Sequence, residues 1–253
     1  ASSSPPPARR PPPGAWSAPR PSLARAVAGE VDARFVAVSL ADVLDMWIGQ
    51  SERNLHDVFE QVRRAAPCVL FLDEVDAIGQ KRSQLRHSAM CSTVNQLLLE
   101  LDAVDASNEG VFVLAATNAP WDVDPALRRP GRLDRTLLVL PPDAAARESI
   151  LRHHLSGRPV AGIDLGRLAA RTEGFSGADL AHLCESAAER AMLDSAASGM
   201  VRMIGMPDLE TALAELRPST GLWFESARNV VLFANEGGAY DDLLAYMRKR
   251  KLL

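Results

Sequence analysis

The feature that most constrains the fold is a run of five apolar residues, Cys68–Leu72, with no polar residue between them. Such a run is typical of a central strand in a parallel sheet, which is buried on both faces. Further short apolar segments with strand character occur at Arg34–Ser39, Val111–Ala115 and Arg135–Leu140. Segments with helical spacing separate them, and this alternation predicts a parallel α/β sheet with helices on both faces.

The second half of the chain changes character after Pro141 and Pro142, because only helical patterns follow. Ser176 and Asp179 have the spacing of a capping box at the start of one of these helices. In the first half, Ser51 is placed to cap a helix that carries Leu55, Val58, Phe59 and Val62. The helices expected beyond that one are Thr93–Leu101, Ala144–Leu155, Leu165–Thr172, Gly177–Ala197, Pro207–Leu216 and Ala239–Arg250.

Charge and cysteine content narrow the class of protein. A net charge of −4 gives no strong field toward nucleic acid or an anionic membrane surface. No apolar run approaches the ~20 residues that span a bilayer. Cys68, Cys91 and Cys184 lie far apart, in or beside apolar segments, which favours reduced buried thiols. We therefore expect a cytoplasmic protein with no nucleic-acid or membrane partner.

The basic run Arg248–Lys251 suits a helix C-terminus, and a nucleic-acid patch is its alternative.

Two carboxylates, Asp73 and Glu74, follow the apolar run directly. A parallel sheet binds ligands at the carboxyl ends of its strands, so both side chains are expected at that edge. In a nucleotide site, Asp73 would hold Mg²⁺ and Glu74 would orient the attacking water. A helix cap or a solvated turn is the alternative.

Two further signals follow the next strand. Asn118 is within plausible reach of the same water or of a γ-phosphate, although an Asn close to Pro120 also fits a simple turn. Four arginines then surround the turn at Pro130 and Gly131, where they form a solvated basic surface or project into the phosphate site of a neighbouring subunit. These arginines are Arg128, Arg129, Arg132 and Arg135.

Taken together, these motifs resemble the AAA ATPase family, especially the group that contains valosin-containing protein, katanin and spastin. The resemblance runs from Leu23 to about Leu216. It implies a P-loop NTPase sheet followed by a small all-helical lid and a C-terminal helix. Asp73 and Glu74 match the Walker B pair, and Asn118 matches sensor 1. Residues 117–135 match the second region of homology, which implies that Arg129 and Arg132 act in a neighbouring subunit's site.

The same resemblance implies the cofactors ATP and Mg²⁺, a hexameric ring and protein substrates that the ring remodels or unfolds. It places Gly177 and Ala178 in the lid turn that lies against adenine, and His154 near the base. A surface histidine in a helix is the alternative for His154. Trp47, Ile48 and Gly49 resemble the pore loop, whose aromatic tip grips extended polypeptide because a large ring offers sequence-tolerant contact area. Packing of the Trp47 ring under its own loop is the alternative.

The phosphate-binding loop departs from the family pattern. Arg20 stands where the loop lysine is expected, and Lys81 is the first lysine in the chain. Pro19 and Pro21 also lack the amide N–H groups that cradle phosphate. Residues 1–22 are rich in Pro, Ser, Ala and Arg, which predicts disorder and leaves the expected first strand missing. Either this stretch is not the natural sequence, as after translation in a wrong frame, or the chain is a degenerate subunit that has lost ATP binding.

The predicted organisation therefore has four parts: low-complexity residues 1–22, an AAA α/β core at 23–142, a helical lid at 143–217 and a C-terminal extension with a helix at 218–253. A catalytically inactive scaffold subunit is the first rival to an active ATPase. A DNA-acting AAA protein, such as a clamp loader, is the second, and the net acidity and absence of a basic stripe argue against it.

Overall fold

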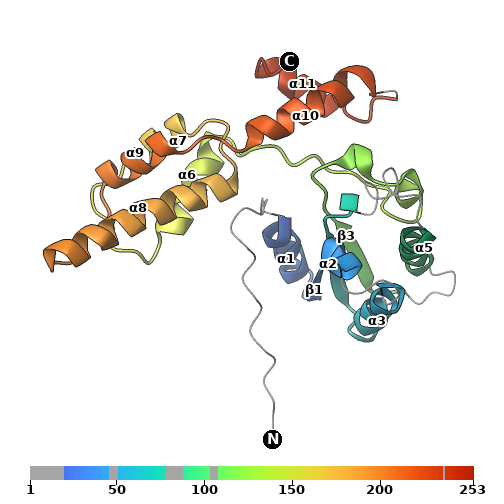
Figure 1. The fold of residues 1–253 in the computed structure, drawn as a ribbon. Helices are drawn as coiled ribbons and strands as arrows, with labels where there is room; N and C mark the ends of the chain where they lie inside the picture. Colours follow the sequence, from blue (N-terminus) through green and yellow to red (C-terminus); the bar gives the residue numbers. More distant parts are fainter. Residues whose placement is uncertain (1–19, 46–50, 78–87, 103–107, 236) are drawn as a thin grey trace, which may run out of the picture. The chain divides into compact units, whose positions relative to one another are not determined.

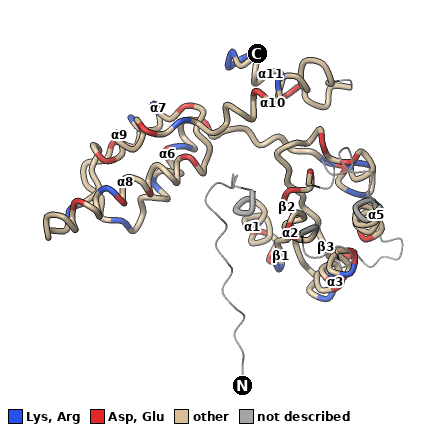
Figure 2. The backbone as a smooth tube through the Cα atoms, in the orientation of Figure 1, with Lys and Arg blue, Asp and Glu red and all other residues tan. Residues whose placement is uncertain are grey.

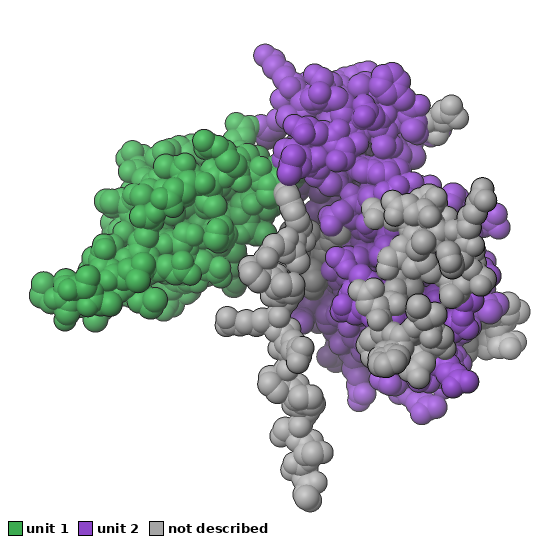
Figure 3. Space-filling view, viewed as in Figure 1, with its two compact units in different colours: residues 1–19, 141–220 green, residues 20–140, 221–253 purple. Residues whose placement is uncertain are grey.

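The computed structural model describes residues 20–45, 51–77, 88–102, 108–235 and 237–253. These residues form two compact units, which Figure 3 colours separately. One unit contains residues 141–220 and is called the lid below. The other contains residues 20–140 together with residues 221–253, and its first part is called the α/β core.

The α/β core holds a parallel sheet of strands β1 (Arg34–Ser39), β2 (Cys68–Asp73) and β3 (Val111–Ala115), in the order β1-β2-β3 (Figure 1). The three predicted strands are thus confirmed. β2 lies in the centre, and Cys68–Leu72 are all buried, as the continuous apolar run predicts. The register aligns Ser39 with Asp73 and Leu72 with Ala115, so the carboxyl ends of the three strands meet at one edge.

Helices cover both faces of this sheet (Figure 1). On one face, α3 (Ser51–Arg64) and α5 (Ser88–Asp102) pack against the strands through Leu55, Phe59 and Leu97, which are fully buried. On the other face, α1 (Arg20–Glu30) buries Ala24 and Ala28 and contacts β1 and β2. The short helix α2 (Leu40–Asp45) follows β1 directly.

The fourth predicted strand, at Arg135–Leu140, is wrong. This segment forms no ladder, and the side chain of Leu137 is 86% exposed. A strand needs a neighbour to pair its backbone groups, and within the described ranges β3 pairs with β2 alone. The ring of Phe112 on β3 is also 57% exposed. Within the described residues β3 is therefore an edge strand, as β1 is.

The lid consists of α6 (Ala144–Leu155), α7 (Leu165–Arg171), α8 (Gly177–Ser198) and α9 (Met206–Glu215) (Figure 1), and all four lie where the sequence predicts them, to within one residue at either end. Asp143, Asp164 and Ser176 cap the first three of these helices with side-chain hydrogen bonds. The predicted capping box is confirmed: Asp179 donates its backbone N–H to Ser176 Oγ (3.1 Å), and Ser176 donates its own to Asp179 Oδ2 (2.7 Å). α8 ends at Gly199 in a left-handed conformation that suits glycine.

Apolar side chains from all four helices fill the lid core, among them Leu151, Leu168, Leu180, Leu183 and Leu209. Acidic and basic residues are interspersed along the same helices (Figure 2). One arginine, Arg147, is buried instead. Its guanidinium donates to the carbonyl oxygens of Ala169 (3.0 and 2.8 Å) and Pro142 (2.8 Å), which ties the chain entering the lid to the end of α7.

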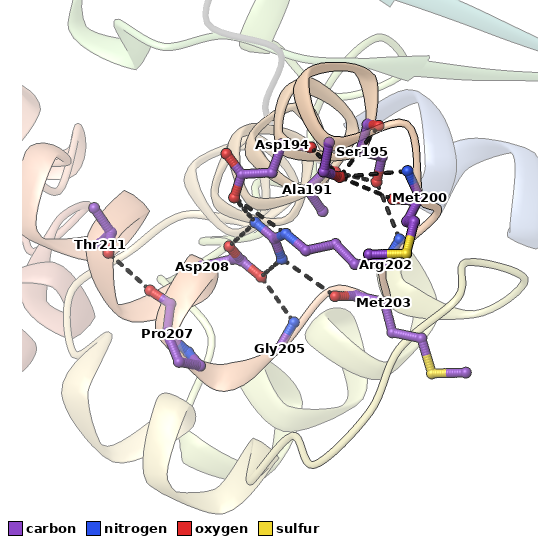
Figure 4. A network of polar contacts seen from close by, with 11 residues as sticks. Ala191, Asp194, Ser195, Met200, Arg202, Met203, Gly205, Pro207, Asp208 and Thr211 are labelled. Carbon is purple, nitrogen blue, oxygen red and sulfur yellow. Dashed lines mark hydrogen bonds and ion pairs between the residues drawn. The ribbon is translucent and has the colours of Figure 1, made fainter.

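A second arginine joins the end of α8 to the start of α9 (Figure 4). Arg202 donates to both carboxylate oxygens of Asp208 (2.8 Å each) and to Asp194 (2.5 and 3.1 Å). The hydrogen bonds from Arg202 lower the pKa of Asp208 against the opposing effect of burial. Asp208 also accepts from the N–H of Gly205 (2.8 Å), so the loop between the two helices is fixed from both sides.

The C-terminal part of the chain forms two helices, α10 (Thr220–Phe233) and α11 (Asp241–Lys249). α11 matches the predicted final helix, whereas α10 was not predicted. The two helices share a buried cluster of Phe224, Ala227, Val231, Leu243 and Met247.

Two further sequence expectations concern thiols and membrane spans. Cys68 and Cys184 are buried free thiols, as predicted, and the Cys91 side chain lies outside the described residues. Among the helices of the described ranges, none has the length and apolar character that crossing a membrane requires.

Candidate functional site

The carboxylate pair lies at the carboxyl edge of the sheet, as predicted. Asp73 is the last residue of β2 and is half-buried, and Glu74 follows it in an exposed position. Asp73 Oδ1 accepts the backbone N–H of Glu74 (2.9 Å), and Ser39 at the end of β1 donates its hydroxyl to Glu74 Oε2 (3.3 Å). Glu74 has a φ of +56°, a left-handed conformation that costs energy in a residue with a side chain. Such strain is concentrated at functional sites.

The loop after β3 runs alongside these carboxylates. Ala116 donates its N–H to Leu72 O (2.8 Å), and Val75 donates its N–H to Ala116 O (3.1 Å). One residue further on, the hydroxyl of Thr117 donates to Asp76 Oδ1 (2.7 Å). The structure therefore brings the loop that carries Asn118 against the loop that carries Asp73 and Glu74.

Asn118 itself is exposed, and the structure adds contacts that the sequence analysis missed. Its backbone carbonyl accepts the indole N–H of Trp223 on α10 (2.5 Å). Ser39, Asp76 and Thr117 were not assigned roles either, although each is a polar residue just at or after the end of a strand. That position was the available signal for these three, whereas no local pattern indicates the contact with Trp223.

The two arginines predicted to act in a neighbouring subunit differ in environment. Arg129 follows the short helix η2 (Pro125–Arg128) and is exposed. Arg132 folds back onto its own chain, where it forms an ion pair with Asp102 at the end of α5 and donates to Ala126 O (2.6 Å). Hydrogen bonding to Asp102 raises the pKa of Arg132, and the same contact lowers the pKa of Asp102.

The predicted adenine-side residues all belong to the lid. Gly177 and Ala178 form the first turn of α8 and are partly exposed. His154 lies in the last turn of α6, with its ring 5.3 Å from that of His153. Burial lowers the pKa of His154, and the nearby charges of His153 and Arg158 lower it further. The lowered pKa favours the neutral form of the ring.

Two predicted segments lie outside the described residues. The proposed pore-loop residues Trp47, Ile48 and Gly49 precede α3, whose first residue is Ser51. Most of the segment that replaces the phosphate-binding loop also lies outside them, up to Pro19, whereas Arg20 and Pro21 are the first two residues of α1.

Of the two implied cofactors, Mg²⁺ fits the residues present better than the phosphate groups of ATP do. Mg²⁺ accepts one or two carboxylates and completes its shell with water and phosphate oxygens. The Asp73 carboxylate meets that need, and no cluster of three or more metal-ligating side chains occurs among the residues described. The phosphate groups of ATP fit poorly, because the chain has no lysine before Lys81 and has prolines at positions 19 and 21.

A parallel sheet with a carboxylate pair and a polar loop at its carboxyl edge, followed by a separate helical lid, defines a P-loop NTPase fold with a lid. Comparison with known families agrees. The ATPase family associated with various cellular activities (AAA) matches residues 20–140, and the AAA+ lid domain matches residues 162–210. The chain belongs to the AAA ATPase family.

Individual relatives point the same way. The chain is 43% identical over 198 residues to the ATP-dependent zinc metalloprotease FtsH of Caldicellulosiruptor bescii, a match covering 77% of this chain and 31% of the relative. It is 40% identical over 209 residues to the cell division cycle protein 48 homolog of Archaeoglobus fulgidus, covering 78% of this chain and 28% of the relative. The chain thus spans about a third of the length of these curated relatives.

Proposed function

We propose that this chain is the ATP-hydrolysing module of a cytoplasmic protein that assembles as a hexameric ring and remodels or unfolds protein substrates. The observation that carries the proposal is the meeting of Asp73, Glu74 and the Asn118 loop at one edge of the sheet. Relatives named as an ATP-dependent protease and a cell division cycle protein 48 homolog support the same kind of work.

Each residue at this edge has a defined task in the proposal. Asp73 would hold Mg²⁺, which neutralises phosphate charge when it is bound. The exposed carboxylate of Glu74 would accept a proton from the attacking water, and the hydrogen bond from Ser39 limits the directions in which it can point. The Asn118 side chain would donate a hydrogen bond at the γ-phosphate.

In the proposed ring, two arginines of one subunit would act in the site of the next subunit. Arg129 is exposed and available to a neighbouring subunit, while Arg132 must first leave Asp102. Trp47, Ile48 and Gly49 are the proposed grip on substrate. Trp47→Ala should abolish substrate translocation and leave basal ATP turnover largely intact, whereas equal loss of both activities would contradict the gripping role.

An inactive subunit is the second candidate, and a specific observation favours it. Lys81 is the first lysine of the chain, and two prolines occupy positions where a phosphate cradle needs N–H groups. Such a subunit would contribute Arg129 to a neighbour's site without turning over ATP itself.

One experiment separates the two candidates. Binding of a fluorescent ADP analogue with Mg²⁺, and ATP hydrolysis, are measured for the wild-type chain, for Glu74→Gln and for Glu109→Gln, an exposed control. An active module predicts that Glu74→Gln retains binding and loses about 10²–10⁴-fold in kcat, while Glu109→Gln matches wild type. Absence of binding and hydrolysis in all three proteins would overturn the ATPase proposal and support the inactive subunit.

A further inference from the structure

The peptide unit between Asn118 and Ala119 is hydrogen bonded at both of its polar atoms. Its carbonyl oxygen, on Asn118, accepts the indole N–H of Trp223 (2.5 Å). Its N–H, on Ala119, donates to the hydroxyl oxygen of Thr117 (2.9 Å), and that hydroxyl in turn donates to Asp76 (2.7 Å). A peptide fixed at both ends restricts the backbone angles on either side of it, and so the direction of the Asn118 side chain.

Trp223 is itself held by aromatic packing. Its ring lies 6.1 Å from that of Trp121, which belongs to the short helix η1 (Pro120–Asp122) just beyond Asn118. The Trp223 ring also meets Phe224 edge-on at 5.2 Å, and Phe224 stacks on Tyr246 of α11 at 5.7 Å. Such ring pairs prefer defined geometries, so the C-terminal helices present the indole N–H from a rigid support.

We propose that Trp223 is a positioning residue for Asn118: the C-terminal helices α10 and α11 order the peptide of the candidate γ-phosphate sensor through one indole hydrogen bond. This inference rests on the proposed ATPase function for its catalytic consequence, but the ordering itself does not. Residues 217–253 lie beyond both matched family regions, so neither match assigns a role to Trp223.

The same helix begins with residues that are bonded inside the lid. Thr220, the first residue of α10, donates its hydroxyl to Gly174 O (2.6 Å), and Ser219 donates its hydroxyl to Asp179 Oδ2 (2.7 Å). Gly174 and Asp179 flank the turn that contains Gly177 and Ala178. The chain that enters α10 is therefore bonded to both flanks of this turn within the lid.

The test separates the hydrogen bond from the packing. Trp223→Phe keeps an aromatic ring and removes the indole N–H, while Leu222→Ala alters an exposed neighbour in the same turn (68% exposed) and serves as the matched control. Hydrogen exchange of the backbone over residues 116–124, thermal unfolding, and kcat and KM for ATP are measured for both variants and wild type.

The expected result is exchange about fivefold faster over residues 116–124 in Trp223→Phe, because one hydrogen bond is lost from a local structure. We also expect kcat to fall about tenfold with KM within about twofold, because a misdirected sensor weakens the transition state more than binding. Leu222→Ala should match wild type in all measurements.

Two outcomes would overturn the inference: unchanged exchange in Trp223→Phe, or faster exchange with unchanged kcat in an active wild-type protein. A wild-type chain that neither binds nor hydrolyses ATP would instead overturn the proposed function. In that case the exchange measurement alone decides whether Trp223 orders the Asn118 peptide.

Discussion

The lid and the α/β core differ in how fully they pair their backbone groups and bury their apolar side chains. In the lid, side chains cap three of the four helices, and Arg147 closes the connection between α6 and α7. In the core, β2 is buried along its length, while Phe112 on β3 and the apolar segment 135–140 remain exposed. The difference arises because a helix satisfies its backbone locally, whereas a strand depends on a neighbour supplied from elsewhere in the chain.

The N-terminal sequence departs from the family pattern at the position of a further expected strand. The family resemblance leads us to expect a first strand before the phosphate-binding loop, and residues 8–13 read Ala-Arg-Arg-Pro-Pro-Pro instead. Proline cannot donate to a strand ladder, so the composition of this stretch disfavours a strand. Within the described residues β3 has a partner on one side only, whereas each helix of the lid pairs its own backbone groups.

The largest expected effect contrasts a buried leucine of the lid with an exposed one of the core. Leu183→Ala should lower the free energy of unfolding by about 2–5 kcal/mol, because it opens a cavity in a packed core. Leu137→Ala should change it by less than about 0.5 kcal/mol, since that side chain is already in water. Urea unfolding followed by circular dichroism measures both. A cost for Leu137→Ala as large as that for Leu183→Ala would mean that segment 135–140 is packed after all.

A smaller effect is expected from the buried arginine of the lid. Arg147→Met preserves much of the side-chain length but leaves the carbonyls of Ala169 and Pro142 without these donors, at a cost of about 2–3 kcal/mol. Arg152→Met, which removes an exposed ion pair with Glu148, should cost about 0.5 kcal/mol or less. The same unfolding measurement compares them. Equal costs would show that the three hydrogen bonds of Arg147 add nothing beyond a surface pair.

The smallest expected effect is on the pH dependence of stability, to which His56 in the core and His154 in the lid should contribute with opposite signs. In the core, a hydrogen bond to Glu100 (2.7 Å) raises the pKa of His56 above its ordinary value of 6.5. The stability that this contact contributes is fully present below pH 6.5 and is lost as the pH rises through the raised pKa. In the lid, burial lowers the pKa of His154, so its contribution is lost as the pH falls below 6.5.

Substitution by glutamine tests both signs. The stability difference between wild type and His56→Gln should shrink from about pH 6 to about pH 9, and the wild type should gain relative to His154→Gln over the lower part of that range. Glu100 stays ionised throughout. Burial acts to raise its pKa, but hydrogen bonds from His56, Arg63 and Gln96 hold it below its ordinary value of 4.5. Thermal midpoints measured across the range would contradict this account if both histidines gave the same sign.

The sequence predicts what is local and misses what depends on distant partners. The strand at Cys68–Leu72 and the capping box of Ser176 and Asp179 follow from neighbouring residues alone, and the structure confirms both. The segment at Arg135–Leu140 has the composition of a strand, but composition cannot supply a pairing edge. α10 was missed because its apolar residues pack against α11 and Trp121, a contact that the sequence of α10 does not reveal.

The candidate site likewise combines contacts that the sequence predicts with one that it does not. Asp73, Glu74 and Asn118 follow apolar strands, so their meeting at one edge is predictable from the parallel arrangement. The hydrogen bond from Trp223 to Asn118 joins residues 105 positions apart, and no periodicity relates them. The roles of all the site residues stay predictions, namely those of Asp73, Glu74, Asn118, Arg129, Arg132, Gly177, Ala178, His154 and the pore-loop residues.

In the proposed ring, the ion pair between Arg132 and Asp102 would affect how a neighbouring subunit engages this surface. A guanidinium that is already matched by a carboxylate presents little net charge to an approaching anion, whereas Arg129 presents its full charge. Any anion brought by a neighbour must displace Asp102 to engage Arg132. The net free energy of that contact is therefore the difference between the binding of Arg132 to the anion and its binding to Asp102. The anion has to bind Arg132 more strongly than Asp102 does.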